Sequence, residues 1–201
     1  MNAARERTGA IVLAGGAARR FGSDKLAASL DGIPLLERAI ASVRPLAASV
    51  VVVLAPDDER PLATDLIAVH DPVAHEGPLV GLGTGLAAMP EHCARVIVVG
   101  GDMPTLTGSV LALLVDTLET AELACLADED RARPLPMAVR REEGLTAVGD
   151  LTSSGERRLR ALVERLDGTV LAVDRWRDLD PVMATLHDVD VPGDLPGRSL
   201  P

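Results

Sequence analysis

The chain has 201 residues and is 47% hydrophobic but only 1% aromatic, which suits one domain with an aliphatic core. Its formal net charge of -10 disfavours binding to nucleic acid or anionic membranes, so a phosphate ligand would need a local basic site. No apolar run approaches the roughly 20 residues of a membrane span, and the polar start MNAARERTG does not resemble a secretory signal. With two isolated cysteines, Cys93 and Cys125, we expect reduced thiols and a cytoplasmic protein.

A glycine-rich, basic loop follows the first predicted strand. The apolar run Ile11–Leu13 suits a strand buried on both faces, and Gly15 and Gly16 end it. Adjacent glycines let the backbone turn sharply and approach a ligand closely. Arg19 and Lys25 follow in the same loop, and Lys25 is the only lysine among 20 basic residues. The loop therefore predicts a phosphate site in which a compact ammonium is needed at position 25.

Strands and helices alternate through the first half of the chain. Apolar runs predict three further strands, at 50–54, 66–69 and 95–99. Helical spacing predicts helices at 35–43 and 78–89, and we expect a short helical piece after the charged loop 56–60. This alternation predicts a three-layer α/β/α fold with a mainly parallel sheet. Ligands bind at the carboxyl ends of such strands, which points to Gly15, Asp71, Asp102, Asp188 and Asp190.

The segment after the strand at 66–69 has two interpretations. Four competent ligands, His70, Asp71, His75 and Glu76, could form a transition-metal cluster, although they lie on a proline-containing loop without fixed geometry. Alternatively, Gly77 begins a tight turn into a helix, and glycines at both ends of that turn let the main chain approach a flat ligand such as a base. We favour the second interpretation.

A lone carboxylate, Asp102, follows Gly100 and Gly101 at the end of the strand 95–99. Mg²⁺ commonly takes one or two carboxylates together with phosphate and water, so this position suits a magnesium ligand. The competing interpretation is a turn aspartate before Pro104.

The second half of the chain has weaker patterns. We expect a helix at 107–120 capped by Thr107 or Ser109, strands at 123–126 and 169–173, and Trp176 as a packing anchor. Because prolines flank Leu135, residues 137–139 predict an edge strand. A helix is expected from Gly155 through Leu166. Four arginines are candidates for contact with an acceptor phosphate: Arg131, Arg133, Arg157 and Arg158. The alternative is that these arginines are solvated, and on the helix a solvated basic face would include i,i+4 ion pairs such as Glu156–Arg160.

These motifs together resemble the molybdenum cofactor guanylyltransferase (MobA-like) family of NTP transferases. The loop matches the signature LAGG-x-x-x-R-x-G-x-D-K at Leu13, Ala14, Gly15, Gly16, Arg19, Gly22, Asp24 and Lys25. Asp102-Met103-Pro104 matches the family's DMP motif, and Gly77 to Gly81 matches its GPL-x-G element. Residues 188–195 resemble its closing N-x-N-T-P-x-D-L element, with Asp188 and Asp190 at the Asn positions and Val191 in place of Thr.

The resemblance implies a single Rossmann-like nucleotidyltransferase domain over residues 1–201, with disordered tails at 1–7 and 196–201. It implies transfer of GMP from GTP to the phosphate of molybdopterin, with release of pyrophosphate and contacts with other molybdenum cofactor biosynthesis proteins. The catalytic residues would be Lys25, Arg19 and Asp102, and Mg²⁺ would bind Asp102 and Asp190. The implied nucleotide-binding residues are Leu13, Ala14, Gly15, Gly16, Lys25, Asp71, Gly77, Pro78, Leu79, Gly81 and Asp102.

Two other functions stay open. The chain could be a cytidylyltransferase or another small-molecule nucleotidyltransferase, or it could be a non-catalytic nucleotide-binding module. The presence of both Lys25 and Asp102 argues against the non-catalytic module, and an assay of pyrophosphate release would separate it from both kinds of enzyme.

Overall fold

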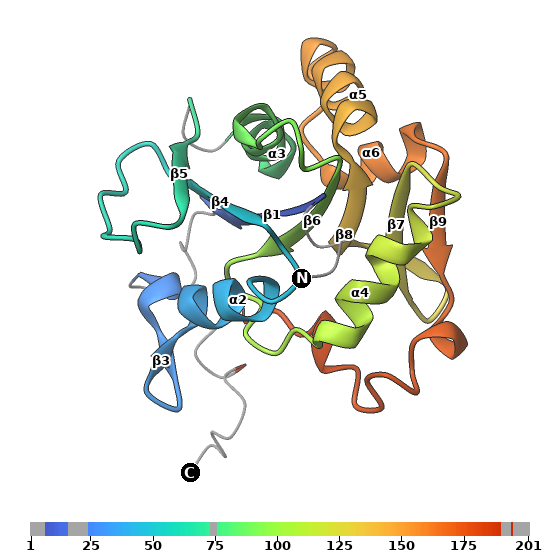
Figure 1. Cartoon of the computed structure of the whole chain (residues 1–201), viewed down its shortest axis with the longest axis horizontal. Coiled ribbons are helices and arrows are strands. Elements are labelled where there is room, and N and C mark those ends of the chain that lie inside the picture. The colour runs from blue at the N-terminus through green and yellow to red at the C-terminus, as the bar shows by residue number, and fades with distance from the viewer. Residues whose placement is uncertain (1–6, 16–23, 73–75, 190–193, 195–201) are drawn as a thin grey trace.

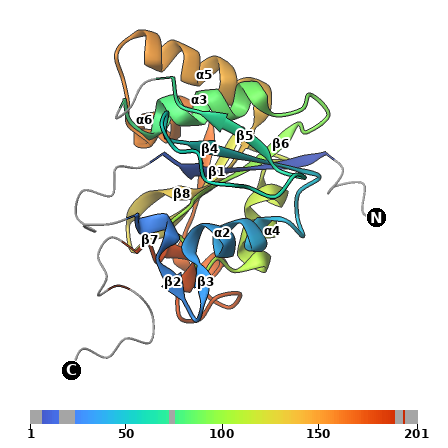
Figure 2. The ribbon, with the colours of Figure 1, turned by 90° about the vertical axis from the view of Figure 1, so that its left-hand side faces the viewer.

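The computed structural model describes residues 7–15, 24–72, 76–189 and 194. In this part of the chain, seven strands form one sheet between two helical layers (Figure 1). Helices α3 (Pro78–Ala88), α5 (Arg141–Ser153) and α6 (Leu159–Arg165) lie over one face, and α2 (Leu35–Val43) and α4 (Gly108–Thr117) over the other (Figure 2). The predicted three-layer α/β/α fold is confirmed.

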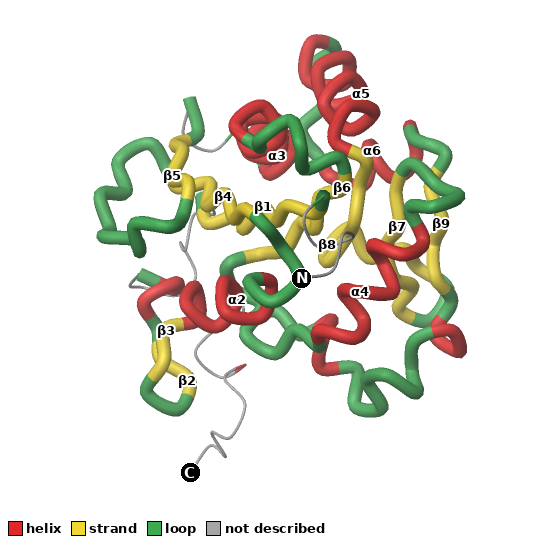
Figure 3. Tube along the Cα trace, in the orientation of Figure 1, coloured by secondary structure: helices red, strands yellow, loops and turns green. Residues whose placement is uncertain are grey.

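The strand order in the sheet is β5-β4-β1-β6-β8-β7-β9 (Figure 3). The strands are β1 (Thr8–Ala14), β4 (Ser49–Leu54), β5 (Ile67–His70), β6 (Arg95–Gly100), β7 (Leu123–Asp128), β8 (Arg131–Arg140) and β9 (Gly168–Leu171). All pairings are parallel except those of β8, which runs antiparallel to β6 and β7. A small hairpin, β2 (Ser29–Leu30) and β3 (Ile33–Pro34), precedes α2, with Asp31 and Gly32 at positive φ in its turn.

The core is divided by the sheet into two aliphatic clusters. Successive residues of a strand point to opposite faces, so Val12 of β1 packs with α2 and α4 while Ile11 packs with α3, α5 and α6. The five apolar positions that predicted α2 are all buried: Leu35, Leu36, Ala39, Ile40 and Val43. Trp176 is fully buried among the α2 and α4 residues, which confirms it as a packing anchor.

The prediction of an edge strand at 137–139 is wrong, because β8 lies inside the sheet between β6 and β7. The prolines that suggested an edge are accommodated by an irregularity in the pairing with β7. Met137 pairs with Cys125, but the next paired residue, Arg133, lies opposite Leu126. The intervening residues 134–136 are therefore outside the ladder, where a proline without an N–H removes no strand hydrogen bond.

Several local predictions also differ from the structure. No helix follows Arg60, since residues 61–66 contain only a turn. The helix expected from Gly155 begins at Leu159, and α5 is an additional helix whose buried side is made of short residues with weak periodicity. The strand predicted at 169–173 is β9, a sheet edge whose Thr169 and Val170 are exposed. Thr107 occupies the N-cap of α4 without a side-chain capping hydrogen bond.

Candidate active site

A pocket of about 390 Å³ lies at the carboxyl ends of the parallel strands, and we call it the strand-end pocket. Its lining comes from the last residues of β1, β4 and β6, the loops after β1, β5 and β6, the start of α3, and one residue of β8. The lining residues are Leu13, Gly15, Val53, Asp71, Gly77, Pro78, Gly81, Gly100, Asp102 and Leu135. Residues predicted from separate motifs therefore share one cavity, because parallel strands end at the same side of the sheet.

Asp71 is held between two glycines of this pocket. An added Cβ on Gly15 would lie 2.8 Å from Asp71 Oδ2, and one on Gly81 would lie 3.1 Å from Oδ1. The Asp71 backbone N–H donates to the carbonyl of Leu54, which fixes the residue after β5. Burial raises the pKa of Asp71, and its buried Oδ1 has no hydrogen-bond partner among the described residues. A buried acceptor without a partner costs free energy, so this oxygen is suited to accept from a ligand.

Lys25 and Asp102 form an ion pair across the site. Lys25 begins the short 3-10 helix η1 (Lys25–Ala27), and its Nζ lies 2.8 Å from Asp102 Oδ2. The lysine side chain is 12% exposed and the aspartate 31%, so the carboxylate keeps access to solvent. The pair joins residues 77 positions apart and places a cation beside Asp102, which lines the strand-end pocket.

The turn before α3 needs a glycine at its first position. Gly77 has φ of 96°, and a Cβ there would lie 2.8 Å from the carbonyl oxygen of Arg157. The next residue, Pro78, is the first residue of the helix, where its missing N–H costs nothing. The predicted tight turn into a helix is thus confirmed, and the helix places Gly81 against Asp71.

A second cavity, which we call the arginine pocket, adjoins the first and has a volume of about 530 Å³. The two cavities share Pro78, Asp102 and Leu135, so Asp102 stands where they meet. The rest of the arginine pocket is lined by Met103, Arg133, Pro134, Arg158, Leu159, Arg160 and Asp188.

The arginines of this second pocket already contact carboxylates of the chain. Arg133 Nη2 lies 3.4 Å from Asp188 Oδ1, and Arg160 Nε lies 3.1 Å from Glu164 Oε1. Arg158 Nη2 lies 2.8 Å from Glu156 Oε2. The side-chain and backbone hydrogen bonds that Arg158 donates to Glu156 lower the pKa of Glu156 to about 2. The expected Glu156–Arg160 pair does not form, because Glu156 precedes helix α6. Glu156 pairs with Arg158 instead, and Arg160 pairs with Glu164.

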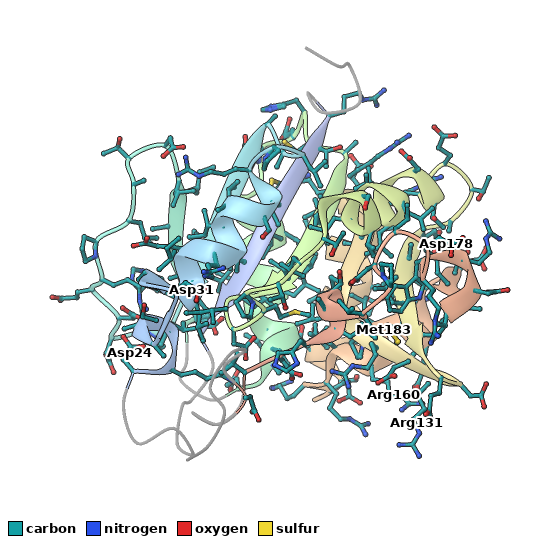
Figure 4. All side chains as sticks on the ribbon, turned by 90° about the horizontal axis from the view of Figure 1, so that it is seen from below. Asp24, Asp31, Arg131, Arg160, Asp178 and Met183 are labelled. Atoms are coloured by element: carbon teal, nitrogen blue, oxygen red, sulfur yellow. The ribbon has the colours of Figure 1, made fainter. Side chains whose placement is uncertain are left out.

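The other two candidate arginines do not line the arginine pocket. Arg131 is exposed and points away from the ribbon at the start of β8 (Figure 4). Arg157 donates to the carbonyls of Thr152 and Glu156 and faces a groove between α3 and α5. Arg160 lines the arginine pocket, although the sequence did not indicate it as a residue that contacts the acceptor. It lies there because α6 begins at Leu159.

The closing element reaches Asp102 through its backbone. The N–H of Val189 donates to the carbonyl of Asp102, and the Val189 side chain is buried with Leu30 and Leu35. The residues directly before Asp188 form a 3-10 turn, η3 (Ala184–Leu186), and not a strand, so the expected strand origin of this element is wrong. Asp188 pairs with Arg133, and Asp190, Val191, Gly16, Arg19 and Gly22 lie outside the described residues.

Other predicted residues are placed as follows. Ala14 and Leu79 are buried, and the strand-end pocket is lined by their neighbours rather than by their side chains. His70 Nε2 lies 3.0 Å from the carbonyl oxygen of Asp58, and His75 is not among the described residues, which contain no group of three or more metal-ligating side chains. Val53 and Leu135 were missed, although Val53 could have been found as a residue near the end of a predicted strand.

Two further observations concern the surroundings of the site. Another cavity lies beside the first residue of β6 and the last residue of β8, away from the strand-end pocket. It is lined by four arginines and four glutamates, whose charges balance. Among the described residues, no helix is long and apolar enough to cross a membrane. The predicted terminal tails, apart from Arg7, lie outside the described residues.

Comparison with known proteins gives the family from the sequence and the fold from solved structures. The family model described as "MobA-like NTP transferase domain" matches residues 10–170. A protein of Chloroflexus aggregans named "Probable molybdenum cofactor guanylyltransferase" is 34% identical over 192 residues, which is 92% of this chain and 90% of the relative.

Two solved structures share the fold. Molybdopterin-guanine dinucleotide biosynthesis protein A of Archaeoglobus fulgidus has a TM-score of 0.77 at 21% identity, covering 94% of this chain and 95% of its own. A 4-diphosphocytidyl-2C-methyl-D-erythritol synthase of Anaerococcus prevotii has a TM-score of 0.71 at 14% identity, covering 94% of both chains. Because the family model matches residues 10–170, well over half of the sequence, this chain belongs to the MobA-like NTP transferase family.

Proposed function

We propose that this protein transfers GMP from GTP to the phosphate of molybdopterin and releases pyrophosphate. The observation that carries the proposal is the meeting of two pockets at Asp102, which is paired with the only lysine of the chain. The strand-end pocket would hold the nucleotide and the arginine pocket the acceptor. The names of the relatives support the same reaction.

Asp71 supports guanine as the base. A carboxylate only accepts hydrogen bonds, and guanine presents neighbouring N–H donors on its Watson–Crick edge, whereas the cytosine edge has a single amino donor beside acceptors. The unpartnered Oδ1 of Asp71 and its position between Gly15 and Gly81 suit a flat base with two donors. Gly77 and Pro78 would border the same base through the tight turn before α3.

The residues where the two pockets meet suit Mg²⁺. Asp102 offers a hard oxygen ligand, keeps solvent access, and already accepts one cation at Oδ2. Asp102, with Asp190 as a second carboxylate, would hold the ion, which when bound offsets negative charge on the phosphates. The Val189–Asp102 backbone hydrogen bond supports this pairing, because Asp190 is the next residue.

The chain's own part in the reaction is positioning and charge stabilisation. An oxygen of the acceptor phosphate attacks the α-phosphorus of GTP, and the bond from that phosphorus to the leaving pyrophosphate oxygen breaks. Lys25 and Arg19 would stabilise charge on the transferring and leaving phosphates, and no side chain forms a covalent bond. Arg133, Arg158 and Arg160 would exchange their internal carboxylates for the acceptor phosphate.

The test is pyrophosphate release by the purified protein with Mg²⁺, molybdopterin and each ribonucleoside triphosphate in turn. We expect release only with GTP and acceptor together, and none from Asp102→Asn. Release with CTP would identify a cytidylyltransferase, and nucleotide binding without release would identify a non-catalytic module. A cytoplasmic location and contacts with other proteins of molybdenum cofactor synthesis stay predictions.

A further inference from the structure

Lys25 is oriented by the residue before it. Asp24 is the N-cap of η1, and its Oδ1 accepts a hydrogen bond of 3.1 Å from the N–H of Leu26. Leu26 is buried in the core on the α2 side of the sheet. The single turn that carries Lys25 is therefore fixed by a capped carboxylate at its start and by an apolar anchor one residue later.

Arg60 contacts that capping carboxylate from a different part of the chain. Its Nη2 lies 3.3 Å from Asp24 Oδ1 and 3.2 Å from Oδ2, which spans 36 positions of sequence. The Arg60 side chain is only 20% exposed although it lies on a loop. Figure 4 shows Asp24 well apart from Arg160, so this contact belongs to the Lys25 side of the site and not to the arginine pocket.

Arg60 is itself held in place on the loop after β4. Its Nε donates to Asp58 Oδ2 at 2.7 Å, and its backbone N–H donates to Asp58 Oδ1 at 3.0 Å. Burial works against ionisation of Asp58, but the hydrogen bonds and charge of Arg60 outweigh it and lower the pKa of Asp58. The carbonyl of Asp58 in turn contacts His70 at the end of β5. A continuous series of polar contacts thus links His70, which precedes Asp71, with Asp24, which precedes Lys25.

We propose that Arg60 is a positioning residue for Lys25: its guanidinium holds the Asp24 cap and so fixes the direction of the lysine toward Asp102. The role of Lys25 on nucleotide phosphate rests on the proposed function, but its orientation by Arg60 does not. A planar guanidinium can contact two carboxylates at once with separate N–H groups, as Arg60 does with Asp58 and Asp24. A lysine at this position would supply the charge without the fork.

The single lysine makes the proposal directly measurable. In protein labelled with ¹³C and ¹⁵N at lysine, the side-chain spectrum contains Lys25 alone, since the chain has no other lysine. We expect Arg60→Gln to shift or broaden this signal, and Arg60→Lys to have an intermediate effect. The matched control is Arg44→Gln, which removes an arginine whose Nη1 lies 2.9 Å from Asp65 Oδ2. The control should leave the Lys25 signal unchanged.

A second measurement separates positioning from general stability. We expect Arg60→Gln to weaken Mg²⁺·GTP binding by about tenfold, the size expected for one charge-assisted contact, and to cause no further loss in a Lys25→Met background. An unchanged Lys25 signal in folded Arg60→Gln, or an additive loss in the double variant, would overturn the positioning role. Absence of GTP binding by the unmodified protein would instead refute the proposed function, and the lysine spectra would still decide the role of Arg60.

Discussion

The two pockets that meet at Asp102 hold their charges in opposite ways. At the strand-end pocket, Lys25, which pairs with the lining residue Asp102, is only 12% exposed, and Asp71 has a buried oxygen without a hydrogen-bond partner among the described residues. In the arginine pocket, the side chains of Arg158 and Arg160 are 80% and 62% exposed and already contact glutamates. A preorganised, desolvated charge contributes far more to binding than an exposed ion pair. We therefore expect large effects from changes in the first pocket and small ones in the second.

Apart from the loss of activity in Asp102→Asn, the largest expected effect is at Lys25. Lys25→Ala should lower kcat/KM by about 10² to 10³-fold, the range for loss of one preorganised donor to a transition state. Lys25→Arg should be nearly as damaging, because a planar guanidinium does not fit a buried position where a compact ammonium lies 2.8 Å from Asp102. Steady-state kinetics test both variants, and near-normal turnover of the arginine variant would show that charge alone is sufficient.

Asp71 should decide which nucleotide stabilises the protein. At a hundredfold excess over its dissociation constant, GTP should stabilise the fold by about 2.7 kcal/mol, and CTP should stabilise it less. Asp71→Asn should reduce the preference for GTP by about 10- to 100-fold in affinity, because the amide cannot accept at both atoms. Thermal-shift titrations measure this preference, and a larger shift with CTP would contradict the base assignment.

The same carboxylate gives a pH dependence. Burial raises the pKa of Asp71, so in the protein without ligand its protonation begins at a higher pH than for an ordinary aspartate. Protonation removes an acceptor, and GTP affinity should therefore fall as the pH is lowered through this pKa and recover above it. Asp71→Asn has no such group and should show a flatter pH profile, which calorimetric titration can establish.

A smaller effect is expected at Asp190, the candidate second carboxylate at the junction. Asp190→Asn should raise the Mg²⁺ concentration for half-maximal turnover by about tenfold and leave the melting temperature without Mg²⁺ largely unchanged. An unchanged Mg²⁺ requirement combined with lower stability would assign Asp190 to the turn before Pro192. Asp188→Asn is the matched comparison, because Asp188 contacts Arg133 instead.

The smallest expected effects are in the arginine pocket. Arg160→Gln should raise KM for the acceptor only a few-fold and leave stabilisation by GTP unchanged, because the exposed side chain loses a screened contact. Arg165→Gln, on the same helix and also in an exposed ion pair, is the control. A loss at Arg160 as large as that at Lys25 would show that the second pocket is desolvated when substrate binds, and the comparison of the two pockets would fail.

The sequence by itself determined the elements whose side chains repeat with a clear period. The β-branched runs of β4 and β6 and the helical spacing of α2 are strong signals, because burial of a strand or helix face requires that pattern. The glycine-rich loop and the carboxylates after strands were also predictable, since parallel strands end at one side of a sheet. These features account for most of the strand-end pocket.

Only the tertiary structure decided the second pocket and the contacts that orient Lys25. The insertion of β8 between β6 and β7 depends on a local break in pairing at two prolines, which in sequence indicate an edge. The short residues on the buried side of α5 give no clear period, and the first residue of α6 determines that Arg160 faces the pocket. The pairing of Lys25 with Asp102, and of Asp24 with Arg60, joins residues 77 and 36 positions apart. Local periodicity carries no information about such distances, because they are set by the order of strands and the packing of loops at their ends.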